Sequence, residues 1–220
     1  MKLWLKVLFI IAGIIAGLTL ILFAMIHQMI KPTTGEKIPD YGMKAQALLV
    51  IDVQEDYTGA NAVRPFKDRE TLVASTNILV SEAEKRKMPV VYVENIIDHP
   101  FFKPLMNGLN AEGAPGTKTD ARIVRIPDSV TLSKNRSDSF SNPKLDEFLR
   151  SKKINELILC GLDGAYCVKS TALGGVNRGY KVTIIPEAVA SESGYTKQEL
   201  MDIWKKAGVE VIPLKDYCTR

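Results

Sequence analysis

Short runs that are almost wholly apolar alternate with amphipathic segments from residue 46 to residue 214 of this chain. A strand that is apolar throughout is buried on both faces, and such strands belong to parallel sheets whose crossover helices cover each side. The pattern therefore predicts an α/β fold: a three-layer sandwich with a mainly parallel sheet covered by helices on both faces. We expect strands at residues 46–53, 88–95, 154–161, 181–188 and 209–214, and helices at residues 69–87, 142–153, 165–179 and 196–208.

The segment from Val7 to Ile26 carries neither charge nor proline. As a helix, about 20 such residues cross the roughly 30 Å of hydrocarbon in a bilayer. A secretory signal peptide is the alternative, but its apolar core normally has about 7–15 residues and precedes a small-residue cleavage site. The longer run here favours one N-terminal transmembrane helix. We expect an anchor over residues 1–30, a polar tether over 31–44 and one globular domain over 45–220.

Basic residues flank the apolar segment on both sides, so the positive-inside rule separates its two orientations only weakly. A very short basic N-terminus usually stays in the cytoplasm, which favours an extracytoplasmic position for the domain. Gly13 and Gly17 stand four residues apart, a spacing that lets two membrane helices approach closely and so allows a homo-oligomer.

The formal net charge of the chain is +4, and three lysines among the first 31 residues account for most of it. The remainder is close to neutral and lacks the clustered basic surface that nucleic acid requires, so we expect no nucleic-acid partner. Cys160, Cys167 and Cys218 form neither a disulfide framework nor a zinc-binding spacing. A bridge between Cys160 and Cys218 stays open, although Cys160 closes an apolar strand and is more simply a core residue.

Open parallel sheets hold their ligands beyond the carboxyl ends of the strands, and three reactive side chains stand there. Asp52 ends the strand in "LLVIDVQEDY", Lys134 ends the apolar segment "DSVTLSK", and Cys167 begins the helix after "ILCGLDG". Alone, each has an ordinary interpretation: a turn-former, a surface cation and a small buried side chain. Together they provide a thiol nucleophile, a carboxylate to take and return its proton, and a cation to hold the pair or the substrate. The helix N-terminus also favours the thiolate of Cys167 over its thiol.

Four segments occur in an order and at a spacing that resemble the isochorismatase-like cysteine hydrolases, and they cover essentially residues 46–191. They are "LLVIDVQEDY", "GAPGTKTDARI", "LSKNRSDSF" and "LILCGLDGAYCVKSTALGGVNRGYKVTIIPEAVAS". The resemblance implies a hydrolase domain with a catalytic triad of Asp52, Lys134 and Cys167. It also implies acyl transfer, in which the cysteine attacks an amide-type carbonyl while the aspartate accepts its proton.

The resemblance further implies an oxyanion hole made by the backbone N–H groups of Asp163 and Cys167, with a non-proline cis peptide bond between Leu162 and Asp163. Many relatives carry an acidic residue two positions before the cysteine, where this chain has Ala165. Three aromatic residues near the catalytic positions are candidate walls of the substrate pocket, and they are Tyr57, Phe140 and Tyr166.

Metal-dependent nicotinamidases of the same family use an aspartate and two histidines. This chain has two histidines, and His27 lies in or beside the apolar segment, so only His99 with Asp98 remains. That pair cannot complete the set, so we expect neither a metal nor another cofactor, and we interpret His99 as a loop residue near the rim of the pocket.

The sequence therefore predicts a membrane-anchored cysteine hydrolase that cleaves a C–N bond of a small amide or carbamoyl-type substrate. Two alternatives stay open: an isochorismatase-type vinyl-ether hydrolase, and a non-catalytic tethered binding module of the same fold. The shape of the pocket, not the triad, separates the two reactions.

Overall fold

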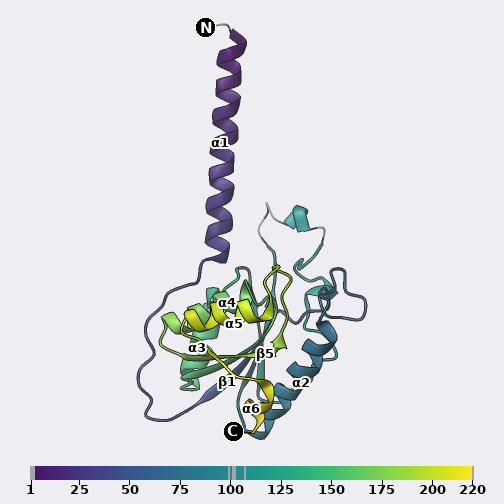
Figure 1. The fold of residues 1–220 in the computed structure, drawn as a ribbon, viewed down its shortest axis with the longest axis vertical. Helices are drawn as coiled ribbons and strands as arrows, with labels where there is room; N and C mark the ends of the chain where they lie inside the picture. Colours follow the sequence, from purple (N-terminus) through teal and green to yellow (C-terminus); the bar gives the residue numbers. More distant parts are fainter. Residues whose placement is uncertain (1–2, 99, 101–102, 107, 220) are drawn as a thin grey trace.

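The computed structural model describes residues 3–98, 100, 103–106 and 108–219. A six-stranded parallel sheet with the strand order β3-β2-β1-β4-β5-β6 lies at its centre (Figure 1). The strands are β1 (Gln46–Ile51), β2 (Val90–Asn95), β3 (Ser129–Lys134), β4 (Glu156–Gly161), β5 (Lys181–Val189) and β6 (Glu210–Val211). Because β1 pairs with β2 on one side and with β4 on the other, the residue that follows β1 lies in the middle of the carboxyl edge of the sheet.

Helices cover both faces of the sheet, as the apolar strands predict (Figure 1). On β1, Leu48 and Val50 belong to one apolar cluster, whereas Leu49 and Ile51 belong to the other. The first cluster includes side chains of α2 (Arg69–Lys85) and α6 (Leu214–Cys218), and the second includes side chains of α3 (Pro143–Ser151), α4 (Cys167–Asn177) and α5 (Lys197–Lys206). The described residues also form three 3₁₀ segments: η1 (Lys103–Met106), η2 (Pro115–Thr117) and η3 (Ser139–Ser141).

The C-terminal end of the domain differs from the sequence-based expectation. The strand expected over residues 209–214 is limited to β6, and α6 follows it at once. Pro213 lacks the N–H group that would extend the ladder, so the strand cannot continue through it. Its carbonyl instead accepts the N–H of Tyr217, whose buried ring joins the apolar cluster under α2.

The N-terminal helix α1 (Leu3–Ile30) projects away from the domain, and its large apolar side chains are exposed (Figure 1). From Lys6 to Ile30 it is long and apolar enough to cross a bilayer, a criterion of length and composition that an N-terminal signal sequence also meets. Residues 31–44 form no helix or strand, as expected for the connection, yet they run along the surface of the domain to the start of β1 (Figure 1).

Candidate active site

The three predicted catalytic side chains meet at the carboxyl edge of the sheet. Asp52 follows β1, Lys134 is the last residue of β3, and Cys167 is the first residue of α4. Lys134 Nζ donates a hydrogen bond to Asp52 Oδ2 at 2.9 Å and lies 3.3 Å from Cys167 Sγ. One buried ammonium therefore contacts both the carboxylate and the sulfur.

The backbone holds Asp52 in a conformation that few residues adopt. Its φ angle is 55°, in the left-handed region, where aspartate is better tolerated than most side chains. Its N–H donates to the Val93 carbonyl at 2.9 Å, which fixes the peptide against β2. Asp52 Oδ1 is buried and accepts no hydrogen bond from the described part of the chain. A free lone pair is thus available to receive a proton.

Burial and charge together set the ionisation of the Asp52–Lys134 pair. Burial raises the pKa of Asp52 above its usual 3.8, and the nearby ammonium opposes this rise. Burial alone would lower the pKa of Lys134, but Asp52 and Cys167 raise it, so the amine stays charged. The pair is an ion pair whose carboxylate is a stronger base than that of a solvated aspartate.

The resting state of Cys167 differs from the thiolate expected at a helix N-terminus. Burial raises the pKa of Cys167 to about 12, the Asp52 carboxylate adds to the rise, and Lys134 only partly offsets it. The resting group is therefore a thiol, because desolvation of the anion outweighs the partial positive charge of the helix end. Removal of its proton requires a base within the site.

The turn before Cys167 brings the nucleophile to the sheet edge. Gly161 adopts a φ angle of 121°, and a Cβ atom there would lie 1.9 Å from the carbonyl oxygen of Ile51, so only glycine fits. The prediction of a cis peptide bond between Leu162 and Asp163 is wrong, because no cis bond occurs among the described residues. The positive φ of Gly161 redirects the chain instead.

Two backbone donors of this turn have no acceptor in the part of the chain that the structure describes. Within the described ranges, neither the N–H of Asp163 nor that of Cys167 donates to a protein atom, although their neighbours in the turn do. The Asp163 carbonyl accepts the N–H groups of Tyr166 and Val168, both at 3.1 Å. The turn thus leaves the two donors expected of an oxyanion hole unsatisfied.

The Asp163 side chain holds this turn against the end of β5. Its Oδ1 accepts the N–H of Ala165 at 2.8 Å and the hydroxyl of Ser191, while its Oδ2 accepts the N–H of Glu192 at 3.0 Å. Both oxygens are therefore engaged in fastening one loop to another. Asp163 fixes the turn in a chain whose position 165 is alanine.

A cavity of about 390 Å³ opens over the sulfur. Two of the predicted aromatic walls, Tyr57 and Tyr166, line it. Phe140 does not, which corrects the third prediction: it lies in η3, and its ring packs against Tyr180 at 5.7 Å and under the guanidinium of Arg178 at 4.6 Å. The short helix η3 directs this ring into the core beneath α4 and away from the cavity.

Several lining residues have no counterpart in the sequence-based prediction: Arg64, Phe66, Asn95, Glu192 and Ser193. Asn95 ends β2, so the rule that ligands lie beyond strand ends would have found it. Arg64 and Phe66 come from the loop between β1 and α2. No periodic pattern marks residues that an irregular loop folds over a site.

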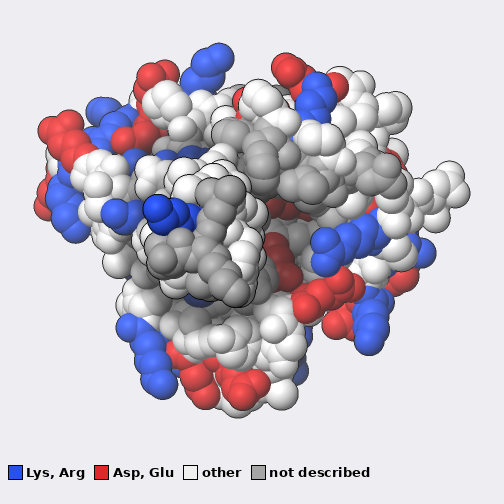
Figure 2. Space-filling model, turned by 90° about the horizontal axis from the view of Figure 1, so that it is seen from above, with Lys and Arg blue, Asp and Glu red and all other residues white. Residues whose placement is uncertain are grey.

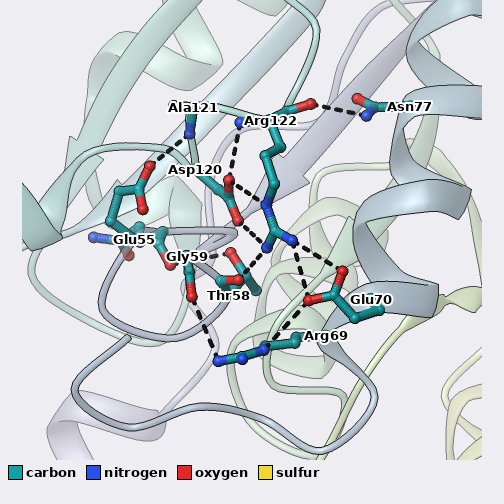
Figure 3. Close-up of polar contacts among 10 residues, drawn as sticks. Glu55, Thr58, Gly59, Arg69, Glu70, Asn77, Asp120, Ala121 and Arg122 are labelled. Carbon is teal, nitrogen blue, oxygen red and sulfur yellow. Dashed lines mark hydrogen bonds and ion pairs between the residues drawn. The ribbon is translucent and has the colours of Figure 1, made fainter. Parts of the chain in front are cut away.

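That loop, which also carries Tyr57, is fastened by Arg122 (Figure 3). The guanidinium of Arg122 contacts both oxygens of Asp120 and both oxygens of Glu70. It also donates to the Thr58 carbonyl, next to Tyr57. Burial would raise the pKa of Asp120, but hydrogen bonds from Arg122 hold it below 3.8. The charged cluster therefore holds one wall of the cavity in place.

The prediction for His99 lies outside the described residues, so the structure does not place it relative to the pocket rim. Among the residues that are described, no three His, Cys, Asp or Glu side chains gather where they could hold a metal ion. All three cysteines are free, and Cys160 is buried in the core, as its position in β4 predicts.

Comparison with known proteins shows what the whole domain is similar to. Residues 46–216 match the family model described as the isochorismatase domain. The chain is 28% identical over 167 residues to streptothricin hydrolase of Streptomyces noursei (76% of this chain, 61% of that protein) and 25% identical over 174 residues to N-carbamoylsarcosine amidase of an Arthrobacter species (74% and 66%). It thus spans less than two thirds of the length of each. A solved cysteine hydrolase from Pseudomonas syringae pv. phaseolicola 1448A has the same fold, with a TM-score of 0.72 at 19% identity over 85% of this chain and 97% of that one.

Proposed function

This chain belongs to the isochorismatase family of hydrolases, and we propose that it is a membrane-anchored cysteine hydrolase that cleaves a C–N bond of a small amide or carbamoyl-type compound. The observation that carries the proposal is the contact of one buried ammonium, Lys134 Nζ, with both Asp52 Oδ2 and Cys167 Sγ. A structural cysteine needs neither a buried base nor a buried cation beside it.

The proposed reaction begins with transfer of the thiol proton of Cys167 to Asp52, whose Oδ1 has no other partner. The sulfur then bonds to the carbonyl carbon, and the N–H groups of Asp163 and Cys167 receive the developing oxyanion. One such donor typically contributes about 2.7–4 kcal/mol to transition-state stabilisation. Lys134 stabilises the transient thiolate while it holds the carboxylate in place.

The steps that follow return every proton. As the carbonyl re-forms, the C–N bond breaks, and Asp52 delivers its proton to the leaving nitrogen. Water then attacks the thioester and gives a proton to the same carboxylate, and the acid departs as Cys167 is released as the thiol. Asp52 thus acts first as base and then as acid, both when the acyl-enzyme forms and when water hydrolyses it. Lys134 keeps its charge throughout.

The substrate class is supported by the relatives and by the cavity. Streptothricin hydrolase is named as a hydrolase and N-carbamoylsarcosine amidase as an amidase of a carbamoyl compound, and about 390 Å³ suits a small molecule. Arg64 lines this cavity, and its guanidinium pairs with no acidic side chain among the described residues. We therefore propose that the substrate carries an anionic group, such as a carboxylate, away from the bond that is cleaved.

The anchor is the second part of the proposal. The length and exposure of α1 support one membrane crossing, and the short basic N-terminus supports a domain on the extracytoplasmic side. Vesicle flotation tests the crossing, and protease protection tests the side. Gly13 and Gly17 leave open space on α1, which allows a second copy to pack there.

Ammonia release tests the reaction. The full chain in detergent micelles would be given a panel of amides, ureides and carbamoyl amino acids without added metal, beside its Cys167→Ala variant. Release that disappears in the variant supports the proposal. A folded protein that releases none of the expected products, but consumes a vinyl ether, would be an isochorismatase-type enzyme. One that turns over neither class would be a tethered binding module.

A further inference from the structure

The last turn of α1 is bonded to the domain beside the candidate active site. The N–H of Ser137 donates to the carbonyl of Met29 at 3.0 Å, and the hydroxyl of Ser170 donates to the carbonyl of Ile30 at 3.1 Å. Arg136 reaches the carbonyl of Gln28. These carbonyls at the end of α1 have no partner within the helix, so the domain supplies the donors that water would otherwise provide.

The residues that follow α1 are fastened as firmly. The N–H and hydroxyl of Thr33 donate to Asp138 Oδ2 at 2.7 and 2.6 Å, and Asp138 is fully buried. Arg178, itself buried against Phe140, donates to the Thr33 hydroxyl at 2.9 Å. The N–H of Ile38 donates to the Arg178 carbonyl at 2.8 Å. We call residues 28–38 the joint.

These contacts distinguish the joint from a loose linker. A flexible chain of about ten residues would have an end-to-end distance of roughly 17 Å and would let the domain rotate freely beneath its anchor. Here both a helix end and the extended residues after it are hydrogen-bonded to the domain, and three of the groups that hold them, Asp138, Ser170 and Arg178, are buried. The direction of α1 is therefore fixed relative to the sheet.

The joint contacts the same edge of the sheet as the catalytic groups. Ser137 lies three residues after Lys134, and Ser170 lies three residues after Cys167. Figure 1 shows α1 leaving the domain on the side where the strands end, and Figure 2, viewed from above, shows a hollow with acidic side chains close to that helix. The side from which α1 departs is thus the side on which the candidate site opens.

We infer that the joint holds the domain with the mouth of its cavity facing the bilayer that α1 crosses, so that this face meets the lipid head-group layer and the substrate enters from that layer. The inference rests on the proposed membrane anchor. It adds that the anchor sets the orientation of the site as well as its location.

Quenching by lipid-bound nitroxides tests this orientation. The full chain would be placed in phosphatidylcholine vesicles in which a small fraction of head groups carries a nitroxide, with Cys167 replaced by alanine and Cys218 by serine. A fluorophore would be attached through Ser193→Cys, at the cavity, or through Lys152→Cys, near the residues that begin the strands. We expect severalfold stronger quenching at residue 193 than at residue 152.

Two replacements with Gly-Ser sequence of unchanged length provide the matched comparison. The first replaces residues 31–38 and adds Arg136→Ala and Ser170→Ala, which removes the Thr33 side-chain contacts together with the side-chain donors to Gln28 and Ile30, and the difference in quenching should largely disappear. The second replaces residues 39–42, which lie outside the joint, and should leave the difference intact. Equal quenching at the two positions in the unaltered chain, or an undiminished difference in the first variant, would overturn the inference. Vesicle flotation, measured in parallel, tests the membrane anchor separately. A folded chain that does not float with the vesicles would refute the anchor, and with it the proposed orientation.

Discussion

The ammonium of Lys134 lies 2.9 Å from Asp52 Oδ2, and both side chains are almost completely buried. Burial removes most of the solvation of each charge, so each depends on the other. The same ammonium lies 3.3 Å from the sulfur of Cys167, which couples the stability of the pair to the chemistry of the site.

Replacing Lys134 with methionine should therefore be strongly destabilising. The variant leaves the Asp52 charge buried and alone, and breaking such a pair typically costs about 3–5 kcal/mol in the free energy of unfolding. Denaturant titration measures the loss. The double variant Asp52→Asn/Lys134→Met carries no buried charge and should recover part of it. A single variant as stable as the parent would show that the pair is not buried in solution.

Replacing Asp52 with asparagine should separate ionisation of Cys167 from catalysis. The Asp52 carboxylate raises the pKa of the thiol, whereas Lys134 lowers it, so the variant should hold a lower cysteine pKa. Alkylation of Cys167 by iodoacetamide should become faster near neutral pH while turnover is abolished. Cys218, which lies outside the site, provides the internal reference for labelling. Slower alkylation of Cys167 in this variant would contradict the charge balance described above.

The pH dependence of kcat/KM should report Asp52. The carboxylate must be free to accept a proton, and burial raises its pKa above 3.8. As pH falls through that raised pKa, the carboxylate is protonated and activity is lost, so the acid limb should lie above the range of a solvated aspartate. A profile measured with an uncharged amide avoids titration of the substrate. Full activity down to about pH 4 would exclude a raised pKa for the base.

Replacing Arg64 with glutamine should affect binding more than chemistry. If the guanidinium pairs with an anionic group of the substrate, KM for carboxylated substrates should rise on the order of tenfold, which corresponds to about 1.4 kcal/mol. The value of kcat, and KM for neutral amides, should change little. Lys67→Gln removes a nearby exposed charge from the same loop as a control. Equal effects on charged and neutral substrates would argue against this role.

The cluster around Arg122 should make the cavity wall sensitive to acid. Because the folded pKa of Asp120 is held below 3.8, its contribution to stability is present above that value and is lost as pH falls through the lowered pKa. Asp120→Asn should lower the free energy of unfolding by about 1.5–3 kcal/mol at pH 7, typical for loss of hydrogen bonds to a charged group. The difference in the free energy of unfolding between parent and variant should become smaller toward pH 3. A difference in the free energy of unfolding that does not change with pH would exclude the ionisation of Asp120 as its source.

The sequence was sufficient to predict the parallel sheet and the proximity of Asp52, Lys134 and Cys167, because the positions of the apolar strands determine both. Asp52 and Lys134 stand at the ends of apolar runs, and Cys167 opens the helix after one, so a parallel sheet brings them to one edge. Phe140 shows the limit of that reasoning. It is close to Lys134 along the chain, yet the turn of η3 directs its ring into the core.

Other features depend on contacts that no local pattern encodes. Arg64 reaches the cavity from an irregular loop whose path is set by distant charges such as those around Arg122. The helix end alone predicts a thiolate at Cys167, whereas burial of the side chain decides its ionisation. Residues 31–38 are polar and contain proline and glycine, so they suggested a free tether, and only the buried Asp138 and Arg178 reveal that they are bound.

Intact-mass analysis during turnover tests the central claim most directly. The full chain, mixed with the best substrate from the ammonia-release panel and quenched in acid, should carry an adduct with the mass of the acyl or carbamoyl group. Peptide mapping should place that adduct on Cys167, and the Cys167→Ala variant should show neither adduct nor hydrolysis. Hydrolysis that persists in the variant, or an adduct confined to Cys160 or Cys218, would contradict a nucleophilic role for Cys167.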